Sequence, residues 1–396
     1  MGDPWLTIIG ITEDGLQGMT DASRSLLSRA DLVFGGPRHL ALAGAGARGR
    51  EWPVPFDIAP VLAQRGRPVV VLASGDPFWF GAGGSLTAHL QADEWRALPA
   101  PGIFSLVAAR LGWRIEDTTC LGLHAAPLAK MRPHLARGCR IIATLRDGDA
   151  PAQLARWLTA QDMGAMNMTV LERVGGQQER LRRCRAAGFG DGQKDAPVAV
   201  ALDGDDLPRG TGMATVPGRA QALFSHDGQI TRPAIRALTL ASLAPRPDEI
   251  LWDIGGGSGA ISFEWALAGG RAWTIEPRET RQRNIAANIG SFGLEGRVTL
   301  CPGAAPAALS GLPEPDAVFV GGGGDAPLFQ ILWPLLPPGA RLVANAVTLE
   351  TEALLADLHA RHGGLLQRIE IAEAAPLGQM RGWQPARPVT QWQVQR

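Results

Sequence analysis

The chain has 396 residues, with 38 basic and 38 acidic side chains, so its formal net charge is zero. This length predicts two or three domains, each able to bury its own core. The balanced charge argues against general nucleic-acid affinity, which needs a basic surplus. The cysteines are scattered and the histidines lack ligand spacing, so we expect neither disulfides nor a metal site. No signal-peptide or bilayer-spanning pattern occurs, which predicts a soluble, cytoplasmic protein without membrane partners.

The first half of the chain alternates apolar strands with helices. We expect strands at 5–10, 31–34 and 68–73, and a helix at about 20–29. Ligands of open α/β sheets collect at the carboxyl ends of strands. The loops at Gly10, Gly75 and Gly102 are therefore expected to share one such edge.

A second lobe and a linker follow. Strands are expected at 140–145, 168–174 and 197–202, with a helix at 150–159. Residues 203–225 are rich in Asp, Gly and Pro, and we interpret them as a linker. These boundaries predict one domain over 1–202 and another over 226–396.

The last part shows a regular βα alternation. Thr231 is the expected N-cap of a helix that runs to about Leu243, with Pro233 in its first turn. Strands are expected at 250–254, 272–276, 297–300, 316–320 and 341–346, with two late strands at 368–372 and 389–394. Such alternation predicts a doubly wound α/β sheet.

The most informative stretch is the turn after the strand at 250–254. Its residues 253–259 read Asp-Ile-Gly-Gly-Gly-Ser-Gly, and an apolar helical pattern follows at once. Glycines there let backbone amides approach a ligand at a helix N-terminus. Glu276 ends the next strand, where a carboxylate can bind both ribose hydroxyls of an adenosine.

Three interpretations of this turn compete. The dinucleotide fingerprint requires Gly-x-Gly-x-x-Gly, but here Gly259 comes two residues after Gly257. The pattern Asp-x-Gly-x-Gly-x-Gly resembles motif I of class I methyltransferases, which use S-adenosylmethionine (AdoMet). A tight turn of purely structural purpose is the third possibility.

Both halves of the chain resemble known families. Residues of about 3–202 are similar to the class III tetrapyrrole methyltransferases of cobalamin biosynthesis, through the Gly10 loop, Ala73-Ser74-Gly75-Asp76-Pro77, Pro101-Gly102 with Ser105, and residues 171–176. Residues of about 226–396 resemble class I decarboxylating precorrin methyltransferases, through Gly228, Thr231-Arg232, motif I, Glu276-Pro277 and Gly321–Gly324. Their order resembles that of fused precorrin methyltransferases carrying both domains.

The resemblance implies a two-lobed fold for the first half, a Rossmann-like fold for the second, and two AdoMet sites. In the first half it assigns Ser74, Gly75, Asp76, Trp79, Ser105 and Leu145 to the cofactor. In the second half it assigns Thr231, Gly255, Gly256, Gly257, Ser258, Gly259, Glu276, Gly303 and Ala304. Two departures stand out. The first loop lacks the family's Gly-x-Gly-Pro-Gly, and Ala304 replaces an acid that often follows Gly303. For Asp76 and Asp253, the alternative role is that the side chain orders its own loop.

The implied reaction is methylation of precorrin-6Y at ring carbons 5 and 15, with decarboxylation of the ring-C acetate side chain. Such a substrate carries many carboxylates, which arginines bind well. Arg232, Arg278 and Arg381 are candidate anchors, although each has the alternative of a solvated surface arginine. Asn345, Arg232 and Arg381 are the catalytic candidates, and Gly321, Gly322, Gly323 and Gly324 are expected to pass close to the planar substrate.

Two other functions stay open at this level. One keeps AdoMet but changes the acceptor to another small molecule or RNA. The other makes one half a non-catalytic scaffold that binds the tetrapyrrole. Family resemblance also implies a homo-oligomer.

Overall fold

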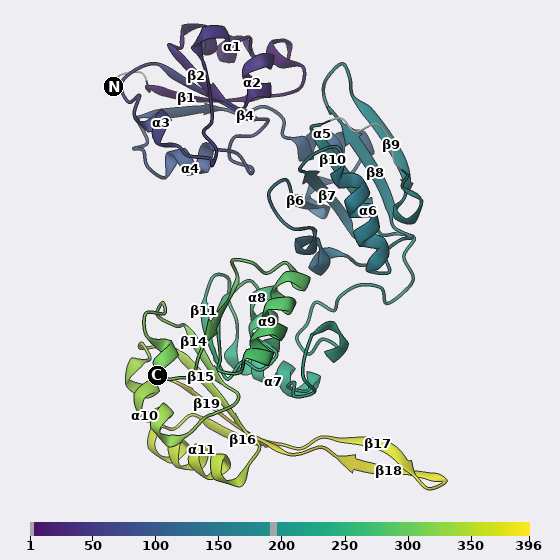
Figure 1. Ribbon diagram of the computed structural model, residues 1–396, viewed down its shortest axis with the longest axis vertical. Helices are drawn as coiled ribbons and strands as arrows, with labels where there is room; N and C mark the ends of the chain where they lie inside the picture. The colour runs from purple at the N-terminus through teal and green to yellow at the C-terminus, as the bar shows by residue number, and fades with distance from the viewer. Residues whose placement is uncertain (1–3, 191–195) are drawn as a thin grey trace. The chain divides into compact units, whose positions relative to one another are not determined.

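The computed structural model describes residues 4–190 and 196–396 and forms two compact units. Unit 1 comprises the described residues up to 128 together with 134–212 (Figure 1). Unit 2 comprises 129–133 and 213–396. The short segment 129–133 thus packs with the second unit although its neighbours in sequence belong to the first.

The first sheet of unit 1 is parallel throughout and has the strand order β3-β2-β4-β1-β5. Apolar residues alternate between its two faces. Ile9, Val70 and Leu72 pack under one set of helices, while Ile8 and Val71 pack on the other side. The elements are β1 (Leu6–Ile11), α1 (Asp21–Arg29), β2 (Leu32–Gly35), α2 (Pro37–Leu42), β3 (Gly49–Glu51), α3 (Ala59–Leu62), β4 (Val69–Ser74), α4 (Gly83–Thr87) and β5 (Trp95–Leu98).

The second sheet of unit 1 is mixed, with the order β6-β7-β10-β8-β9. Only its β6–β7 pair is parallel among the pairings of the described residues. Helix α5 packs on it through Phe104 and Val107. The elements are α5 (Ile103–Leu111), β6 (Thr119–Gly122), β7 (Arg140–Leu145), α6 (Ala150–Ala160), β8 (Asn167–Glu172), β9 (Arg180–Arg185) and β10 (Val198–Asp203).

Unit 2 is built on a sheet with the order β13-β12-β11-β14-β15-β19-β16. Strands β11 to β15 pair in parallel, and β19 pairs antiparallel with both β15 and β16. The elements are α7 (Pro233–Leu243), β11 (Ile250–Ile254), α8 (Ala260–Leu267), β12 (Arg271–Glu276), α9 (Glu279–Phe292), β13 (Val298–Pro302), β14 (Ala317–Val320), α10 (Ala326–Leu335), β15 (Arg341–Ala346), α11 (Leu349–His362), β16 (Leu365–Ile369), β17 (Ala372–Leu377), β18 (Met380–Pro385) and β19 (Val389–Gln395).

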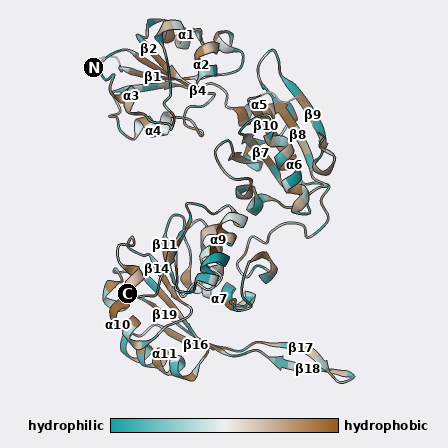
Figure 2. Cartoon of the chain, in the orientation of Figure 1, coloured by the Kyte–Doolittle hydropathy of each residue, from teal (hydrophilic) through white to brown (hydrophobic). Residues whose placement is uncertain are grey.

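Helices cover both faces of the unit 2 sheet, as the alternation predicts. Leu251 and Phe319 belong to the core under α7, α8 and α9, whereas Trp252 and Val318 belong to the core under α10 and α11. Neighbouring residues of a strand point to opposite faces, so each strand contributes to both cores. Figure 2 shows these central strands coloured as hydrophobic.

Three local predictions for the last part were wrong. Arg232, not Thr231, precedes α7 as its N-cap, and its side chain makes no capping bond. The expected strand at 368–372 lies instead at Leu365–Ile369. The stretch that follows is not a loop: β17 and β18 pair as a hairpin that projects from the sheet (Figure 1), and Arg381 lies on β18.

No helix of the described residues is both long and apolar enough to cross a membrane.

Candidate functional sites

Unit 1 contains a cavity of about 580 Å³ at the carboxyl ends of β1 and β4. Three loops cross there at very short range. A Cβ on Gly10 would lie 1.8 Å from the Gly75 carbonyl oxygen, and one on Gly75 would lie 2.6 Å from Cα of Gly102. Gly75 also has a φ of +57°, which side chains rarely adopt. The glycines at these positions are therefore required by the crossing itself.

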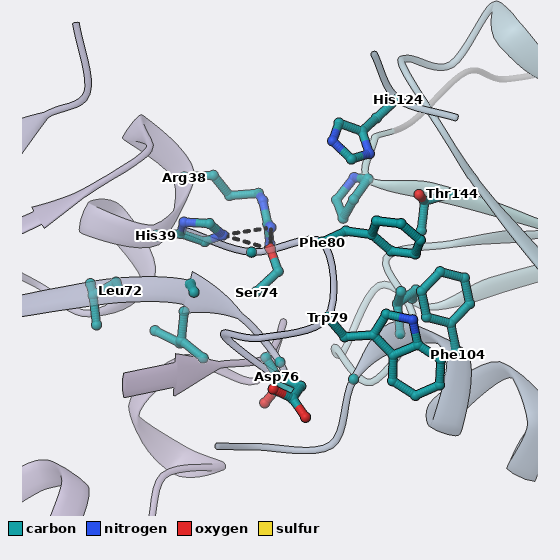
Figure 3. Close-up of a pocket in the computed structure, with 18 of the residues that line it drawn as sticks. Arg38, His39, Leu72, Ser74, Asp76, Trp79, Phe80, Phe104, His124 and Thr144 are labelled. Atoms are coloured by element: carbon teal, nitrogen blue, oxygen red, sulfur yellow. Dashed lines mark hydrogen bonds between the residues drawn. The ribbon is translucent and has the colours of Figure 1, made fainter. Parts of the chain in front are cut away.

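Aromatic side chains supply much of the cavity wall (Figure 3). The rings of Trp79 and Phe104 lie 5.0 Å apart between centroids, and those of Phe80 and Phe104 lie 5.9 Å apart. Phe104 is buried at 2% exposure, whereas Trp79 is 40% exposed. A wall of this kind suits a flat, largely apolar ligand.

A polar corner interrupts the aromatic wall where Arg38 and His39 of α2 meet Ser74 at the end of β4 (Figure 3). The Arg38 guanidinium donates to the Glu13 carboxylate and, at 3.0 Å, to the Ser74 hydroxyl. Its Nη2 also lies 3.0 Å from His39 Nε2, which in turn lies 2.8 Å from Ser74 Oγ. The corner thus connects residues that lie at or just after the ends of β1, β2 and β4.

The imidazole of this corner is held neutral. Burial, and secondarily the positive charge of Arg38, lower the pKa of His39 from 6.5 to about 4. Burial also lowers the pKa of Arg38, with Arg173 as the second cause. At neutral pH His39 therefore carries an accessible lone pair rather than a charge.

Most residues predicted for the first cofactor site line this cavity: Ser74, Gly75, Asp76, Trp79 and Leu145. Ser105 is exposed on α5 and is not among the lining residues. The Asp76 carboxylate accepts from the Phe78 amide at 2.8 Å, so it orders its own loop. This is the loop-capping alternative that its sequence position allowed.

In unit 2 the Gly-rich turn packs too closely for side chains. A Cβ on Gly255 would lie 2.3 Å from the Gly322 carbonyl oxygen, and one on Gly256 would lie 2.3 Å from Thr274 Cγ2. Gly259, with φ +76°, is the N-cap of α8. The turn leaves the Gly257 position open, with no atom nearer than 3.9 Å to an added Cβ. Such a cradle fits a ligand that approaches the backbone.

Glu276 holds the turn with both carboxylate oxygens. Oε2 accepts from the Gly257 amide at 2.8 Å and Oε1 accepts from the Arg278 amide at 2.9 Å. The side chain is only 2% exposed, and the backbone oxygen of Glu276 accepts from Gly303 and Gln282. Each carboxylate oxygen keeps a second lone pair with which a ribose hydroxyl could pair.

Asp253 lies beneath the turn and is almost fully buried. Its Oδ2 accepts from the Ser262 amide and hydroxyl, at 3.2 and 2.6 Å, while Oδ1 has no hydrogen-bond partner among the described residues. Burial raises its pKa to about 6, and the charge of Glu276 adds to this in the same direction. Asp253 therefore orders the start of α8 at an electrostatic cost.

The remaining candidates of unit 2 are spread over several places. Gly321–Gly323 are exposed after β14, next to Gly255, and Arg232 and Arg278 are exposed. Asn345 has both ends of its amide engaged: it donates to Thr239 Oγ1 at 3.0 Å and accepts from Gln391 Nε2 at 2.8 Å. Thr231 contributes its carbonyl to Arg236. The predicted substrate arginines come from three different elements: Arg232 precedes α7, Arg278 precedes α9 and Arg381 lies on β18.

Sequence reasoning missed Arg38, His39 and the aromatic wall beyond Trp79. A signal for the first two exists, because Gly35-Gly36-Pro37 marks a strand-to-helix turn of the kind that places ligands in α/β proteins. Phe104 carries no such signal, since its apolar helix position reads as ordinary core.

Two family models match this chain. The tetrapyrrole (corrin/porphyrin) methylases match residues 6–189, and the precorrin methyltransferase domain matches residues 222–396. The crystal structure of the C-terminal domain of precorrin-6Y C5,15-methyltransferase from Rhodobacter capsulatus is 62% identical, with a TM-score of 0.46, covering 46% of this chain and 100% of that one.

Some curated relatives match nearly the whole chain, and others match about half of it. Cobalt-precorrin-7 C(5)-methyltransferase of Salmonella typhimurium is 30% identical over 180 residues, which are 44% of this chain and 88% of that protein. Precorrin-6Y C(5,15)-methyltransferase [decarboxylating] of Sinorhizobium sp is 48% identical over 398 residues, which cover 98% of this chain and 96% of the relative. On that full-length identity, this chain belongs to the decarboxylating precorrin-6Y C5,15-methyltransferases and is a C-methyltransferase.

Proposed function

We propose that the chain uses AdoMet to methylate precorrin-6Y (precorrin-6B) at ring carbons 5 and 15, and decarboxylates the ring-C acetate side chain to give precorrin-8. The observation that carries this proposal is that one chain folds two separate glycine-crossed strand-end sites and matches a bifunctional relative over its whole length. Unit 1 is assigned carbon 5 from its resemblance to the tetrapyrrole methylases, and a relative of about half the chain's length that is named for carbon 5 alone supports a separate carbon 5 activity. Carbon 15 and decarboxylation then fall to unit 2.

In unit 2 the adenosyl group would lie on the turn Gly255–Gly259, with Glu276 accepting from the ribose and the Gly303–Ala304 turn near the adenine. The open space at Gly257 and the two unused lone pairs of Glu276 support this placement. Bound AdoMet supplies an electrophilic methyl group. The chain's own task is to orient the acceptor carbon and exclude water, which can lower a barrier by about 7–11 kcal/mol.

In unit 1 the cofactor would lie against Ser74, Gly75, Asp76, Trp79 and Leu145, and the tetrapyrrole would share the same cavity. Ser105 stays a proposed contact from the family pattern, although it lies outside the cavity lining. Closely crossing backbones and an aromatic wall fit a flat cofactor and a flat substrate better than an extended polymer.

The substrate of unit 2 would enter beside Gly321–Gly324, which follow β14 and touch the Gly255 turn. Arg232, Arg278 and Arg381 are proposed to bind its carboxylates, with Asn345 at the end of β15. When the acetate side chain loses its carboxyl group as carbon dioxide, the electrons of the broken carbon–carbon bond pass into the conjugated ring, and protonation of the remaining carbon leaves a methyl group.

A homo-oligomer remains part of the proposal. The β17–β18 hairpin supports it, because Leu377, Met380 and Trp383 are between 70% and 77% exposed on it. Light scattering after size exclusion tests this, comparing the chain with a Leu377→Ser/Trp383→Ser variant. An unchanged mass would remove the hairpin from the interface.

The decisive assay supplies the full chain with AdoMet and precorrin-6B and measures methyl groups transferred and carbon dioxide released. The proposal requires two methyls and one carbon dioxide per macrocycle, and two AdoMet sites per chain by titration calorimetry. One methyl with one bound AdoMet would make the other unit a non-catalytic scaffold. No methyl transfer at all would overturn the proposal.

A further inference from the structure

The polar corner of unit 1 has a defined hydrogen-bond direction. A guanidinium can donate but never accept, so the His39 Nε2 that faces Arg38 Nη2 at 3.0 Å must be the acceptor nitrogen. The neutral ring then carries its hydrogen on Nδ1, which is buried and has no hydrogen-bond partner among the described residues. Ser74 Oγ accepts from Arg38 and therefore directs its own hydrogen to His39 Nε2, 2.8 Å away.

Charge at this corner argues against a simple carboxylate anchor. Arg38 already pairs with Glu13, whose side chain is 10% exposed. The pair is neutral as a unit, and Arg173, which adds a positive charge nearby, lies outside the cavity lining. What the corner presents to the cavity is a hydroxyl backed by a neutral imidazole, which is an arrangement for moving a proton.

The proposed carbon 5 reaction requires such a movement. A new bond forms between the donor methyl and the meso carbon as the methyl–sulfur bond breaks, and S-adenosylhomocysteine leaves with the sulfur electron pair. The meso carbon then holds both hydrogen and methyl, and the macrocycle is cationic. Loss of that hydrogen as a proton returns the C–H electrons to the ring and restores conjugation.

We propose that the Ser74–His39 pair accepts this proton: Ser74 Oγ takes it from the meso carbon and passes its own hydrogen to His39 Nε2. Glu13 is a positioning residue that holds the Arg38 guanidinium. Arg38 donates to the same Nε2 lone pair that accepts the proton, so this hydrogen bond breaks when Nε2 is protonated. Because the hydrogen leaves an electron-poor carbon, a weak base is sufficient. The lowered pKa of His39 keeps that base free of solvent protons at neutral pH. This inference rests on the proposed function of unit 1.

The test compares wild-type chain, His39→Gln and His89→Gln, using substrate that carries either hydrogen or deuterium on the carbon 5 position. Gln keeps a hydrogen-bonding group near Nε2 but cannot accept a proton. His89 belongs to unit 1 and lies outside the cavity lining, so it is the matched control. Carbon 5 methylation, carbon 15 methylation and AdoMet binding are measured on each full-length chain.

We expect His39→Gln to lower carbon 5 methylation by about 10²- to 10⁴-fold and to expose a primary deuterium isotope effect. Both AdoMet sites and carbon 15 methylation should remain as in wild type and His89→Gln. Unchanged carbon 5 methylation would overturn the relay, as would loss of the unit 1 AdoMet site, which would make His39 part of the binding wall. A wild-type chain that does not methylate carbon 5 would overturn the proposed function as well.

A second readout needs no turnover. ¹⁵N NMR of the histidine-labelled full chain should show one ring, absent from His39→Gln, that is neutral at pH 7 and protonated on Nδ1. A His39 signal protonated on Nε2, or charged at pH 7, would contradict the hydrogen-bond direction on which the relay depends.

Discussion

The two proposed methyl-transfer sites both lie at the carboxyl ends of parallel strands, but they are built differently. In unit 2 the site is formed mainly by backbone. Its glycines pack on Gly322 and Thr274, and the Glu276 carboxylate accepts hydrogen bonds from two backbone amides. Unit 1 adds side chains to its own glycine crossing: an aromatic wall and a hydroxyl–imidazole corner contributed by separate elements. A backbone site is encoded in consecutive residues, whereas a side-chain site is assembled from distant ones.

The largest expected effect comes from Gly255→Ala. The new Cβ would meet the Gly322 carbonyl at 2.3 Å in a backbone with φ +72°. We expect a loss of about 2–5 kcal/mol of unit 2 stability, with loss of carbon 15 methylation and carbon dioxide release, while carbon 5 methylation survives. Gly290→Ala on α9 is the control, because nothing lies within 4 Å of its added Cβ. Equal loss of both methylations would mean that the units do not work independently.

Glu276→Ala should weaken one AdoMet site and leave the other unchanged. The Gly257 and Arg278 amides lose their acceptors, and the ribose loses its partner. We expect a penalty of about 1–3 kcal/mol in cofactor binding, measured by titration calorimetry. Glu279→Ala is the matched control, since that side chain is 83% exposed. Two unaffected sites would remove Glu276 from the cofactor site.

Asp253 gives unit 2 a pH dependence at its Gly-rich turn. Its pKa is raised in the folded chain from 3.8 to about 6. Between these values the folded state binds a proton that the unfolded state does not, so this group's contribution to stability falls as pH rises from about 4 to 6. Asp253→Asn should flatten that part of the profile and change it by about 1–2 kcal/mol. Urea unfolding of the wild-type chain and of Asp253→Asn at pH 4.5 and 7 checks this. The same change in unfolding free energy between the two pH values in both proteins would contradict it.

The smallest effect is expected from Trp79→Ala in unit 1. The indole is 40% exposed, so its loss opens the cavity wall with little damage to the core. We expect ligand binding there to weaken by about 0.5–1.5 kcal/mol, seen as a higher KM for carbon 5 methylation at an unchanged carbon 15 rate. A KM that does not change would exclude the aromatic wall from substrate binding.

Much of the fold was predictable because its signals are local. The apolar runs that became β4, β7, β11 and β15, and the glycine turns after them, carry their periodicity and breakers within a few residues. The β17–β18 hairpin was missed for the same reason: its strands include Pro376 and Gly382 and face no core, so neither composition nor alternation marks them.

For the sites, the sequence by itself determined motif I, Glu276, the Ser74-Gly75-Asp76 turn and the doubly wound class, because each is a short pattern tied to one strand end. Only the tertiary structure decided that Arg38 and His39 meet Ser74, that Phe104 backs Trp79, and that Asn345 has both ends of its amide engaged. These contacts join residues from 25 to 106 positions apart. Which of many distant partners a side chain meets depends on how strands pair and helices pack, and no local pattern carries that information.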